Sequence, residues 1–483
     1  MNSASSASRL SRRGFGQTLG AAAATPLLQA QTGPAARSSF PAGFIWGSAT
    51  ASYQVEGAAA EDGRKPSVWD TFSKTPGKVA GGDTGDVAND SYHLYKEDIR
   101  LLKYLGVQAY RLSVAWPRVF PDGAGTPNEK GITYYERVVD ELLANGIQPF
   151  VTLFHWDLPQ ALEDRQGGWQ SRDTAKAFAD YCTFVTRRLS DRVKRFFTIN
   201  EFSCFIDEGY GSGTKAPGKK VPAAALCQIR HTAVYAHGLG VQAIRAAARG
   251  GVQVGIAENP TMCVPVIETK EHIEAAQKAM RELNAHYLGV VLSGRYTDQY
   301  LASMGAGAPR FTPDELKAIA SPLDFVGLNI YAPTHVRADD SKAGFAVVPP
   351  PSSYPRMASP WILVDPAIAY WAPRHMGEIW GVKNVYITEN GCSSDDKLAA
   401  DGHIYDTDRV MYVRQHLSQA QRATAEGWPL RGYFLWSLMD NFEWTDGYSK
   451  RFGAYYVDFK TQKRTPKLSA ELYREVVRRN GLA

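Results

Sequence analysis

The stretch Tyr134-Tyr-Glu-Arg-Val-Val-Asp-Glu-Leu-Leu-Ala-Asn145-Gly-Ile-Gln148-Pro-Phe-Val-Thr-Leu-Phe-His-Trp156 decides the fold of this chain. Its first part is amphipathic, and the Asn-Gly pair that follows is a typical helix stop. The run from Gln148 to Trp156 is rich in apolar and β-branched residues, as strands are. A helix that leads directly into a strand is one unit of an α/β fold with parallel strands.

Seven further runs of the same kind lie around this unit, separated by helical stretches such as Tyr92–Leu105. The eight runs are Phe44–Ser52, Ala109–Trp116, Gln148–Trp156, Arg195–Glu201, Val252–Pro260, Asp324–Tyr331, Asn384–Gly391 and Leu430–Asp440. They predict an α/β fold with a single (β/α)8 TIM barrel over residues 40–483 and elaborated loops on its carboxyl face. The alternative is an open doubly wound sheet, which usually carries a Gly-rich phosphate loop after its first strand. No such loop follows Ser52.

Composition excludes several classes of protein. The 483 residues include 54 Lys+Arg and 49 Asp+Glu, a net charge of only +5, and 44% are hydrophobic. These values are typical of a globular protein and argue against a disordered chain or a dedicated nucleic-acid binder. The five cysteines show no CxxC spacing, so we expect buried free thiols rather than a disulfide framework or a zinc ribbon.

The N-terminus has the features of an export signal. Arg12-Arg13-Gly14-Phe15 opens a stretch, residues 14–36, that carries no charge. With Pro26 in its middle, the stretch is too weakly apolar for a membrane span, so we expect no membrane partner. It predicts a twin-arginine signal peptide over residues 1–30, a linker over 31–39, and a mature chain from about Gln31 in the bacterial periplasm or outside the cell. The alternative is an uncleaved, disordered tail.

Polar and aromatic residues follow the strand-like runs at positions where a core would hold apolar ones. They are Gln54, Glu56, Arg111, His155, Trp156, Asp157, Asn200, Glu201, Asn329, Tyr331, Glu389, Asn390, Trp436, Asp440, Asn441, Glu443 and Trp444. In a (β/α)8 barrel these strand ends meet on the face that carries the active site.

The chain lacks the sequence motifs of several other kinds of enzyme. The chain has neither HExxH nor GxSxG, which disfavours a metalloprotease and a serine hydrolase. The segment from Gly213 to Lys220 resembles a phosphate-binding loop, but it ends in Lys where that loop needs Ser or Thr, so we interpret it as a flexible loop. Two glutamates on different strands, surrounded by amide, indole and guanidinium groups, suit glycoside hydrolysis. Taken singly, each glutamate could equally form a salt bridge on the barrel rim.

Eight motifs, in the same order, resemble those of family 1 glycoside hydrolases, the β-glucosidase family. They begin at Phe44, Tyr110, His155, Thr198, Gly327, Ile387, Trp436 and Arg451, and read FIWGSATASYQVEG, YRLSVAWPR, HWDLP, TINE, GLNIY, ITENG, WSLMDNFEW and RFGAYYVDF. The resemblance covers residues 40 to about 478.

This resemblance implies a retaining β-glycosidase that removes terminal, non-reducing β-D-glycosyl residues through a covalent glycosyl-enzyme, without cofactor or metal. Glu389 would be the nucleophile and Glu201 the acid/base. Arg111 and Tyr331 would tune the nucleophile, so we expect a lowered pKa at Glu389 and a raised one at Glu201. The implied substrate-binding residues are Gln54, His155, Trp156, Asn200, Asn329, Tyr331, Trp436, Glu443, Trp444 and Phe452.

Two residues narrow the implied substrate, a di- or oligosaccharide or an aryl glucoside. The presence of Glu201 favours an O-glycosidase over the family's thioglucosidases, and Glu443 would repel a sugar phosphate. Glucose, galactose and fucose stay open, which adds β-galactosidase and β-fucosidase activity to the expectations, and the oligomeric state stays open too. The alternative is an inactive family member or a periplasmic sugar-binding barrel.

Overall fold

The computed structural model describes residues 39–482. The predicted signal peptide and almost all of the predicted linker lie outside the described residues. Within residues 39–482, no helix is both long enough and apolar enough to cross a membrane. All five cysteines are buried and free, which confirms the prediction for the thiols.

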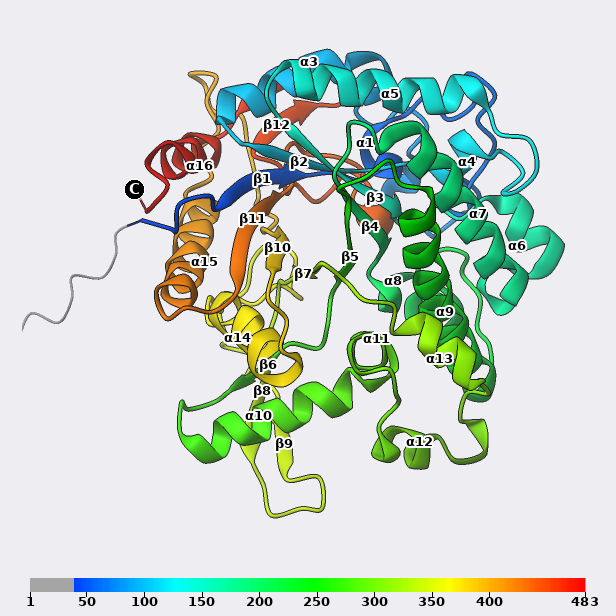
Figure 1. The fold of residues 1–483 in the computed structure, drawn as a ribbon. Coiled ribbons are helices and arrows are strands. Elements are labelled where there is room, and N and C mark those ends of the chain that lie inside the picture. Colours follow the sequence, from blue (N-terminus) through cyan, green and yellow to red (C-terminus); the bar gives the residue numbers. More distant parts are fainter. Residues whose placement is uncertain (1–38, 483) are drawn as a thin grey trace, which may run out of the picture. The chain divides into compact units, whose positions relative to one another are not determined.

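Eight parallel strands close into a barrel, so the predicted (β/α)8 architecture is confirmed (Figure 1). The strands are β1 (Ile45–Ala49), β2 (Ala109–Ser113), β3 (Gln148–Phe154), β4 (Arg195–Asn200), β5 (Gln253–Glu258), β7 (Phe325–Asn329), β10 (Val385–Asn390) and β11 (Leu430–Trp436). Each lies inside one predicted run but ends before the run does, because the chain turns away there to form the loops of the carboxyl face. The ring closes where β1 pairs with β11.

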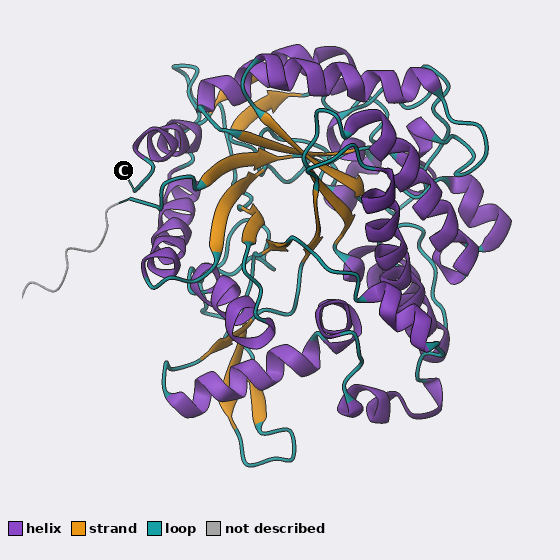
Figure 2. Ribbon diagram, viewed as in Figure 1, coloured by secondary structure: helices purple, strands orange, loops and turns teal. Residues whose placement is uncertain are grey.

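Long helices surround the strands (Figure 2). They are α3 (Ser91–Leu105), α5 (Glu129–Ala144), α7 (Arg172–Leu189), α9 (Ala223–Ala247), α10 (Lys270–Leu283), α14 (Ile368–Trp380), α15 (Thr407–Ala425) and α16 (Leu468–Arg479). The helix predicted from Tyr134 begins earlier, at Glu129, and ends where Gly146 takes a left-handed φ of 73°. Helices α7 and α9 lie side by side, and α3 lies beside α5 (Figure 1).

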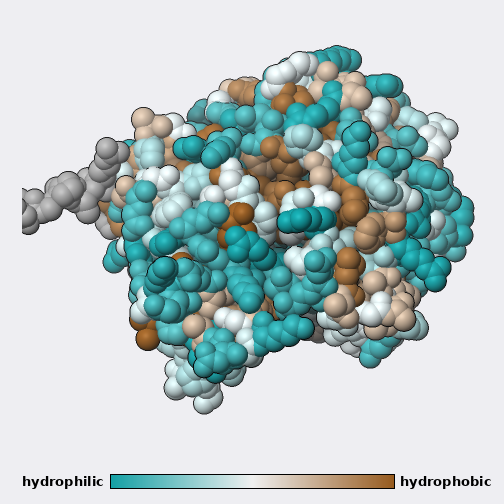
Figure 3. Space-filling view, turned by 60° about the horizontal axis from the view of Figure 1, so that its bottom comes forward, coloured by the Kyte–Doolittle hydropathy of each residue, from teal (hydrophilic) through white to brown (hydrophobic). Residues whose placement is uncertain are grey.

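Short elements build the connections between the barrel strands and helices. The short α-helices are α1 (Ser52–Val55), α2 (Val68–Ser73), α4 (Trp116–Val119), α6 (Gln160–Gln166), α8 (Phe202–Ile206), α11 (Val290–Ser293), α12 (Asp298–Met304) and α13 (Pro313–Ile319). Strands β6 (Cys263–Pro265), β8 (Thr334–Ala338) and β9 (Phe345–Val348) form a small sheet against α10, and β12 (Tyr455–Asp458) pairs with β13 (Lys463–Pro466). On the face shown in Figure 3, apolar residues gather near the middle of a largely hydrophilic surface.

An aromatic cluster fills the barrel interior below the carboxyl face. Its rings belong to Phe150, Phe197, Phe325, Tyr386 and Phe434. Glycines make room for them: a Cβ on Gly47 would lie 2.3 Å from the Phe434 ring. Burial of each ring contributes about 1.5–3 kcal/mol. The cluster also forms a rigid base for the site, because the Arg111 guanidinium lies 5.2 Å from the centre of the Phe197 ring.

Candidate active site

A cavity of about 580 Å³ opens at the carboxyl ends of the barrel strands. Its walls are formed by His155, Trp156, Glu201, Cys204, Glu208, Lys215, Asn259, Tyr331, Trp361, Glu389, Trp436, Glu443, Trp444, Thr445, Asp446 and Phe452. Nine of these are residues that the sequence singled out as catalytic or substrate-binding. Residues far apart in the chain thus share one wall because parallel strands all present their carboxyl ends to the same face.

Glu389, on β10, is held from two sides. Arg111 Nη1 donates to Glu389 Oε1 at 2.6 Å, and the Tyr331 hydroxyl donates to Oε2 at 2.9 Å. The carboxyl and the guanidinium are both almost fully buried. Arg111 comes from β2 and Tyr331 directly follows β7, so three strands fix the position of this one carboxyl.

Glu201 follows β4 and has a left-handed backbone conformation, with φ 50° and ψ 83°. Such a conformation is costly for a residue with a side chain and is concentrated at functional sites. Its Oε1 accepts a hydrogen bond from Asn329 Nδ2 at 2.8 Å, and the Cys204 thiol donates to Oε2 at 3.3 Å. Its donors are therefore an amide and a thiol, whereas Glu389 has a guanidinium.

Asn200 and Asn329 connect the two glutamates through hydrogen bonds. Arg111 Nη2 donates to Asn200 Oδ1, which also accepts from Asn329 Nδ2 at 3.0 Å. Since Asn329 donates to Glu201 as well, a continuous path runs from Glu389 through Arg111 to Glu201. A displacement of either carboxyl would therefore disturb the other.

Burial raises the pKa of both carboxyls. At Glu389 desolvation outweighs the charge and hydrogen bond of Arg111 and the hydrogen bond of Tyr331, and the pKa rises to about 7. At Glu201 desolvation raises the pKa against the hydrogen bond from Asn329. The expected lowering at Glu389 is therefore not seen: the predicted cation and hydroxyl are in place, but burial is the larger effect. Two carboxyls that disfavour each other's charge titrate as a pair.

Indole rings form a large part of the cavity wall. The Trp156 and Trp444 rings lie 4.3 Å apart between centroids, and the His155 ring stacks at 6.0 Å on Trp436. Trp156 and Trp444 both have left-handed backbones, with φ of 77° and 51°. Flat apolar faces beside polar groups suit the C–H faces and hydroxyls of a sugar ring.

Two polar side chains near this wall have a hydrogen-bonding atom without a protein partner. Gln54 Nε2 donates to the Phe442 carbonyl and to Glu443 Oε2, at 2.9 and 3.3 Å, while its Oε1 has no protein partner. His155 Nε2 lies 3.1 Å from the Asn200 amide nitrogen, and its Nδ1 is unpartnered. Desolvation lowers the His155 pKa well below its usual range and raises that of Glu443 to about 8. Both groups are therefore largely neutral near pH 7, so the repulsion of a sugar phosphate expected from a charged Glu443 is not supported.

Seven residues of the cavity wall were not predicted from the sequence. They are Cys204, Glu208, Lys215, Asn259, Trp361, Thr445 and Asp446. Lys215 lies in the segment that we interpreted as a flexible loop, and two of its backbone hydrogen bonds anchor that loop. Asn259 directly follows β5 and could have been found by its position, whereas the others lie in connections, where neither the hydrophobic period nor the position in the sequence gives a signal.

Several strand-end residues belong to the scaffold instead. Glu56 accepts from Arg118 Nε at 2.9 Å and from the Tyr135 hydroxyl at 2.6 Å, and Asp157 accepts from Ser52 at 2.7 Å. The salt bridge with Arg118 gives Glu56 a structural role. Among residues 39–482, no three His, Cys, Asp or Glu side chains are grouped as a metal site requires.

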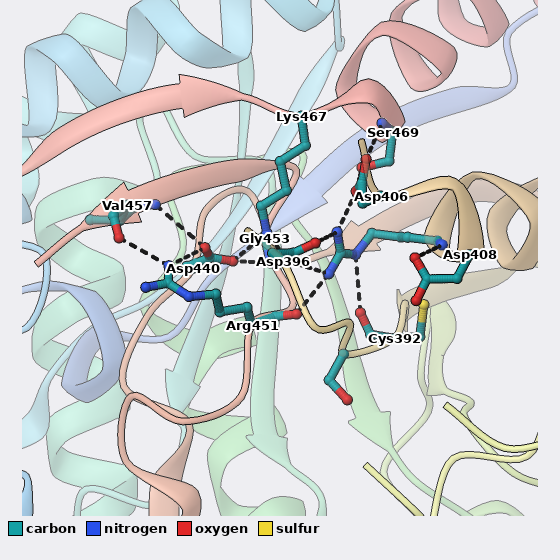
Figure 4. A network of polar contacts seen from close by, with 12 residues as sticks. Cys392, Asp396, Asp406, Asp408, Asp440, Arg451, Gly453, Val457, Lys467 and Ser469 are labelled. Atoms are coloured by element: carbon teal, nitrogen blue, oxygen red, sulfur yellow. Dashed lines mark hydrogen bonds and ion pairs between the residues drawn. The ribbon is translucent and has the colours of Figure 1, made fainter. Parts of the chain in front are cut away.

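A buried ionic network supports the loops on the carboxyl face (Figure 4). We call it the bracing network, and its charged members are Asp396, Asp406, Arg409, Asp440, Arg451 and Lys467. Lys467 Nζ lies 2.6 Å from both Asp396 and Asp440. Asp440 also accepts from the Gly453 amide at 3.0 Å, next to Phe452 of the cavity wall. The network thereby joins the loop after β11 to α15 and α16.

A closed (β/α)8 barrel with two buried glutamates at the ends of its fourth and seventh strands, flanked by indole rings, is the architecture of a glycosidase that works with a carboxyl pair. Comparison with known sequences agrees. The profile of glycosyl hydrolase family 1 matches residues 36–482, and the chain belongs to this family.

Relatives and solved structures match almost the whole chain. β-Glucosidase A of Thermotoga maritima is 43% identical over 446 residues, which are 92% of this chain and 98% of the relative. β-Glucosidase A of Acetivibrio thermocellus is 41% identical over 92% of this chain and 99% of the relative. The structure of the Thermotoga maritima β-glucosidase with glucoimidazole has a TM-score of 0.84 and 41% identity, and covers 92% of this chain and 100% of that one. A structure of the same enzyme with castanospermine has the same values.

Proposed function

We propose that this family 1 hydrolase is a retaining β-glucosidase in which Glu389 is the nucleophile and Glu201 the acid/base. The hydrogen bonds to Glu389 carry the assignment. Its two oxygens face the donors of Arg111 and Tyr331, and a guanidinium can only donate. The pair's proton therefore belongs on Glu201, next to a thiol and an amide.

The reaction then has two steps. Glu389 attacks the anomeric carbon while Glu201 gives its proton to the leaving oxygen, and a glycosyl ester of Glu389 results. The ester has no charge on Glu389, so the reason for keeping Glu201 protonated is gone. Ionised Glu201 then takes a proton from water, whose oxygen attacks the anomeric carbon and releases Glu389 as a carboxylate.

The sugar at the non-reducing end binds against the inner wall. Trp436 forms the stacking face, and the free atoms of Gln54 and His155 are placed to bond hydroxyls. Protonated Glu443 can donate to a hydroxyl, with Trp444 and Phe452 beside it. Asn200 lies between both glutamates, where a hydroxyl next to the reacting carbon would be. Because Gln54 and Glu443 can each accept or donate, β-galactosides and β-fucosides are proposed as secondary substrates.

The anomer of an azide product tests the two roles. Glu389→Gly with added azide should give the α-glycosyl azide, because azide fills the place of the nucleophile and inverts once. Glu201→Ala should give the β-azide from dinitrophenyl glucoside, since the glycosyl-enzyme still forms. If Glu389→Gly gave the β-azide and Glu201→Ala the α-azide, Glu201 would be the nucleophile and Glu389 the acid/base. A wild-type protein that releases no nitrophenol from aryl β-glucosides would instead support the inactive sugar-binding barrel.

We further propose that residues 1–30 direct export by the twin-arginine route and that the enzyme acts in the periplasm or outside the cell. The support is the Arg12-Arg13 pair before an uncharged stretch. Changing both arginines to lysine should leave the precursor and its activity in the cytoplasm. Unchanged activity in the periplasmic fraction of that double variant would contradict the proposal.

A further inference from the structure

Lys215 is the one lysine or arginine among the residues that form the cavity wall, and the mechanism above does not use it. We propose that Lys215 is a positioning residue whose charge favours the ionised form of Glu201, so that Glu201 can act as a base on the glycosyl-enzyme. This inference rests on the proposed roles of the two glutamates.

Several contacts fix the Lys215 ammonium at the cavity. Nζ lies 4.6 Å from the centre of the Trp156 ring and 3.3 Å from Glu208 Oε2. The side chain is only 18% exposed. An ammonium held over an indole face and partly desolvated keeps its charge and its place. Glu208 is 41% exposed, so water screens the anion more than the cation.

The backbone holds the lysine as firmly as the side chain does. Lys215 N donates to the Glu208 carbonyl at 3.2 Å, and Gly218 N donates to the Lys215 carbonyl at 2.8 Å. Lys219 N donates to the Gly209 carbonyl at 2.9 Å, so the loop lies against the π-helical turn Asp207–Ser212. That turn follows α8, which begins immediately after Glu201. The lysine and the acid/base therefore belong to one short, internally bonded segment.

Charged and titratable groups face Glu201 from each neighbouring element. They are Cys204 on α8, Glu208 and Lys215 after it, Arg111 on β2, His155 after β3, Glu258 on β5, Tyr331 after β7 and Glu389 on β10, and His155 is neutral because burial lowers its pKa. Of these, only Arg111 and Lys215 are cations, and Arg111 is committed to Glu389 at 2.6 Å. Lys215 is the cation left for Glu201, and its charge lowers the Glu201 pKa against the rise caused by burial.

The first chemical step needs Glu201 protonated and the second needs it ionised. The charge of Lys215 favours the ionised form. In the first step, the proton leaves Glu201 for the departing oxygen, and the carboxylate that remains faces the ammonium. In the second step, that carboxylate receives a proton from the attacking water. A neutral residue at position 215 would leave Glu201 protonated on the glycosyl-enzyme at higher pH, and water attack would slow.

The test is the pH dependence of Lys215→Met on two substrates. With a dinitrophenyl glucoside, which makes the second step limiting, the acid limb of kcat should move up by about one pH unit, the size expected for loss of a nearby charge. With an alkyl glucoside, which needs the proton of Glu201, the alkaline limb of kcat/KM should move up similarly. Lys215→Arg should keep both limbs near their wild-type positions.

Lys220→Met is the matched control, since it removes a lysine from the same loop that does not form the cavity wall. Lys215→Gln replaces Lys215→Met if the latter is insoluble, and the same shifts are expected. If the acid and alkaline limbs of the Lys215→Met pH profiles stay at their wild-type positions while KM changes, the inference is overturned. Lys215 would then be a substrate-binding residue only. Failure of the proposed function is distinct, because it would appear in the azide products of the glutamate variants.

Discussion

The catalytic cavity and the bracing network are both buried and charged, yet their carboxyls differ. In the bracing network, three carboxylates face three cations, Arg409, Arg451 and Lys467. The cavity wall holds five carboxyls, those of Glu201, Glu208, Glu389, Glu443 and Asp446, and the cations beside them are Arg111 and Lys215. Burial raises the pKa of Glu201, Glu389 and Glu443, whereas Lys467 and Arg409 outweigh burial at Asp396 and lower its pKa.

The number of cations per carboxylate therefore distinguishes these two clusters. Asp396, which faces two cations, stays charged near neutral pH and holds its neighbours. A carboxyl that lacks a full partner keeps a proton within reach of that pH, as an acid/base catalyst must.

Glu389→Gln should cause the largest effect on activity. The nucleophile is lost, and turnover of aryl glucosides should fall on the order of 10⁵–10⁶-fold, as it does for other covalent nucleophiles. The thermal midpoint should fall moderately, because the buried Arg111 guanidinium loses its anionic partner and keeps only a neutral acceptor. Kinetics and calorimetry check both. An unchanged midpoint would show that the charge of Glu389 contributes nothing to the stability of the fold.

Lys467→Met should cause the largest effect on stability. It leaves Asp396 and Asp440 short of a cation in a fully buried site, and breaking such a pair costs about 3–5 kcal/mol. Denaturant unfolding measures the change, with the exposed Lys463→Met as control. A variant as stable as the control would show that Arg409 and Arg451 suffice for the network.

Arg111→Lys should shift the pH dependence of kcat/KM. The Arg111 charge and hydrogen bond lower the Glu389 pKa against burial, and lysine cannot reproduce the two-sided contact with Glu389 and Asn200. The Glu389 pKa should rise, so the acid limb should move to higher pH. An acid limb at the wild-type position would exclude Arg111 as the group that tunes the nucleophile.

Asp396→Asn should destabilise the fold by an amount that depends on pH. The folded-state pKa of Asp396 is lowered, so its charge contributes stability above about pH 4, its unfolded value, and loses it as pH falls through the folded pKa. The difference in unfolding free energy between wild type and variant should therefore narrow toward pH 2–3. A constant difference from pH 7 to pH 3 would contradict this account.

Most of the barrel and the residues deep in the site could be predicted from the sequence. Each predicted run contains one strand, since a strand buried on both faces reads as a continuous apolar run such as the one before His155. The inner residues were predictable because they follow those runs directly. Lys215 and Trp361 were not, because they lie in long connections whose path is set by contacts between distant segments.

The sequence by itself determined the order of strands and helices, the two glutamates and the polar groups at the strand ends. Only the tertiary structure decided which carboxyls share a cavity and which are neutralised. Glu56 and Glu389 both stand near the end of a strand, yet Glu56 is held by Arg118 within the scaffold and Glu389 lines the cavity. The reason is physical: proton affinity depends on burial and on the charges within a few ångströms, and those neighbours come from parts of the chain that only folding brings together.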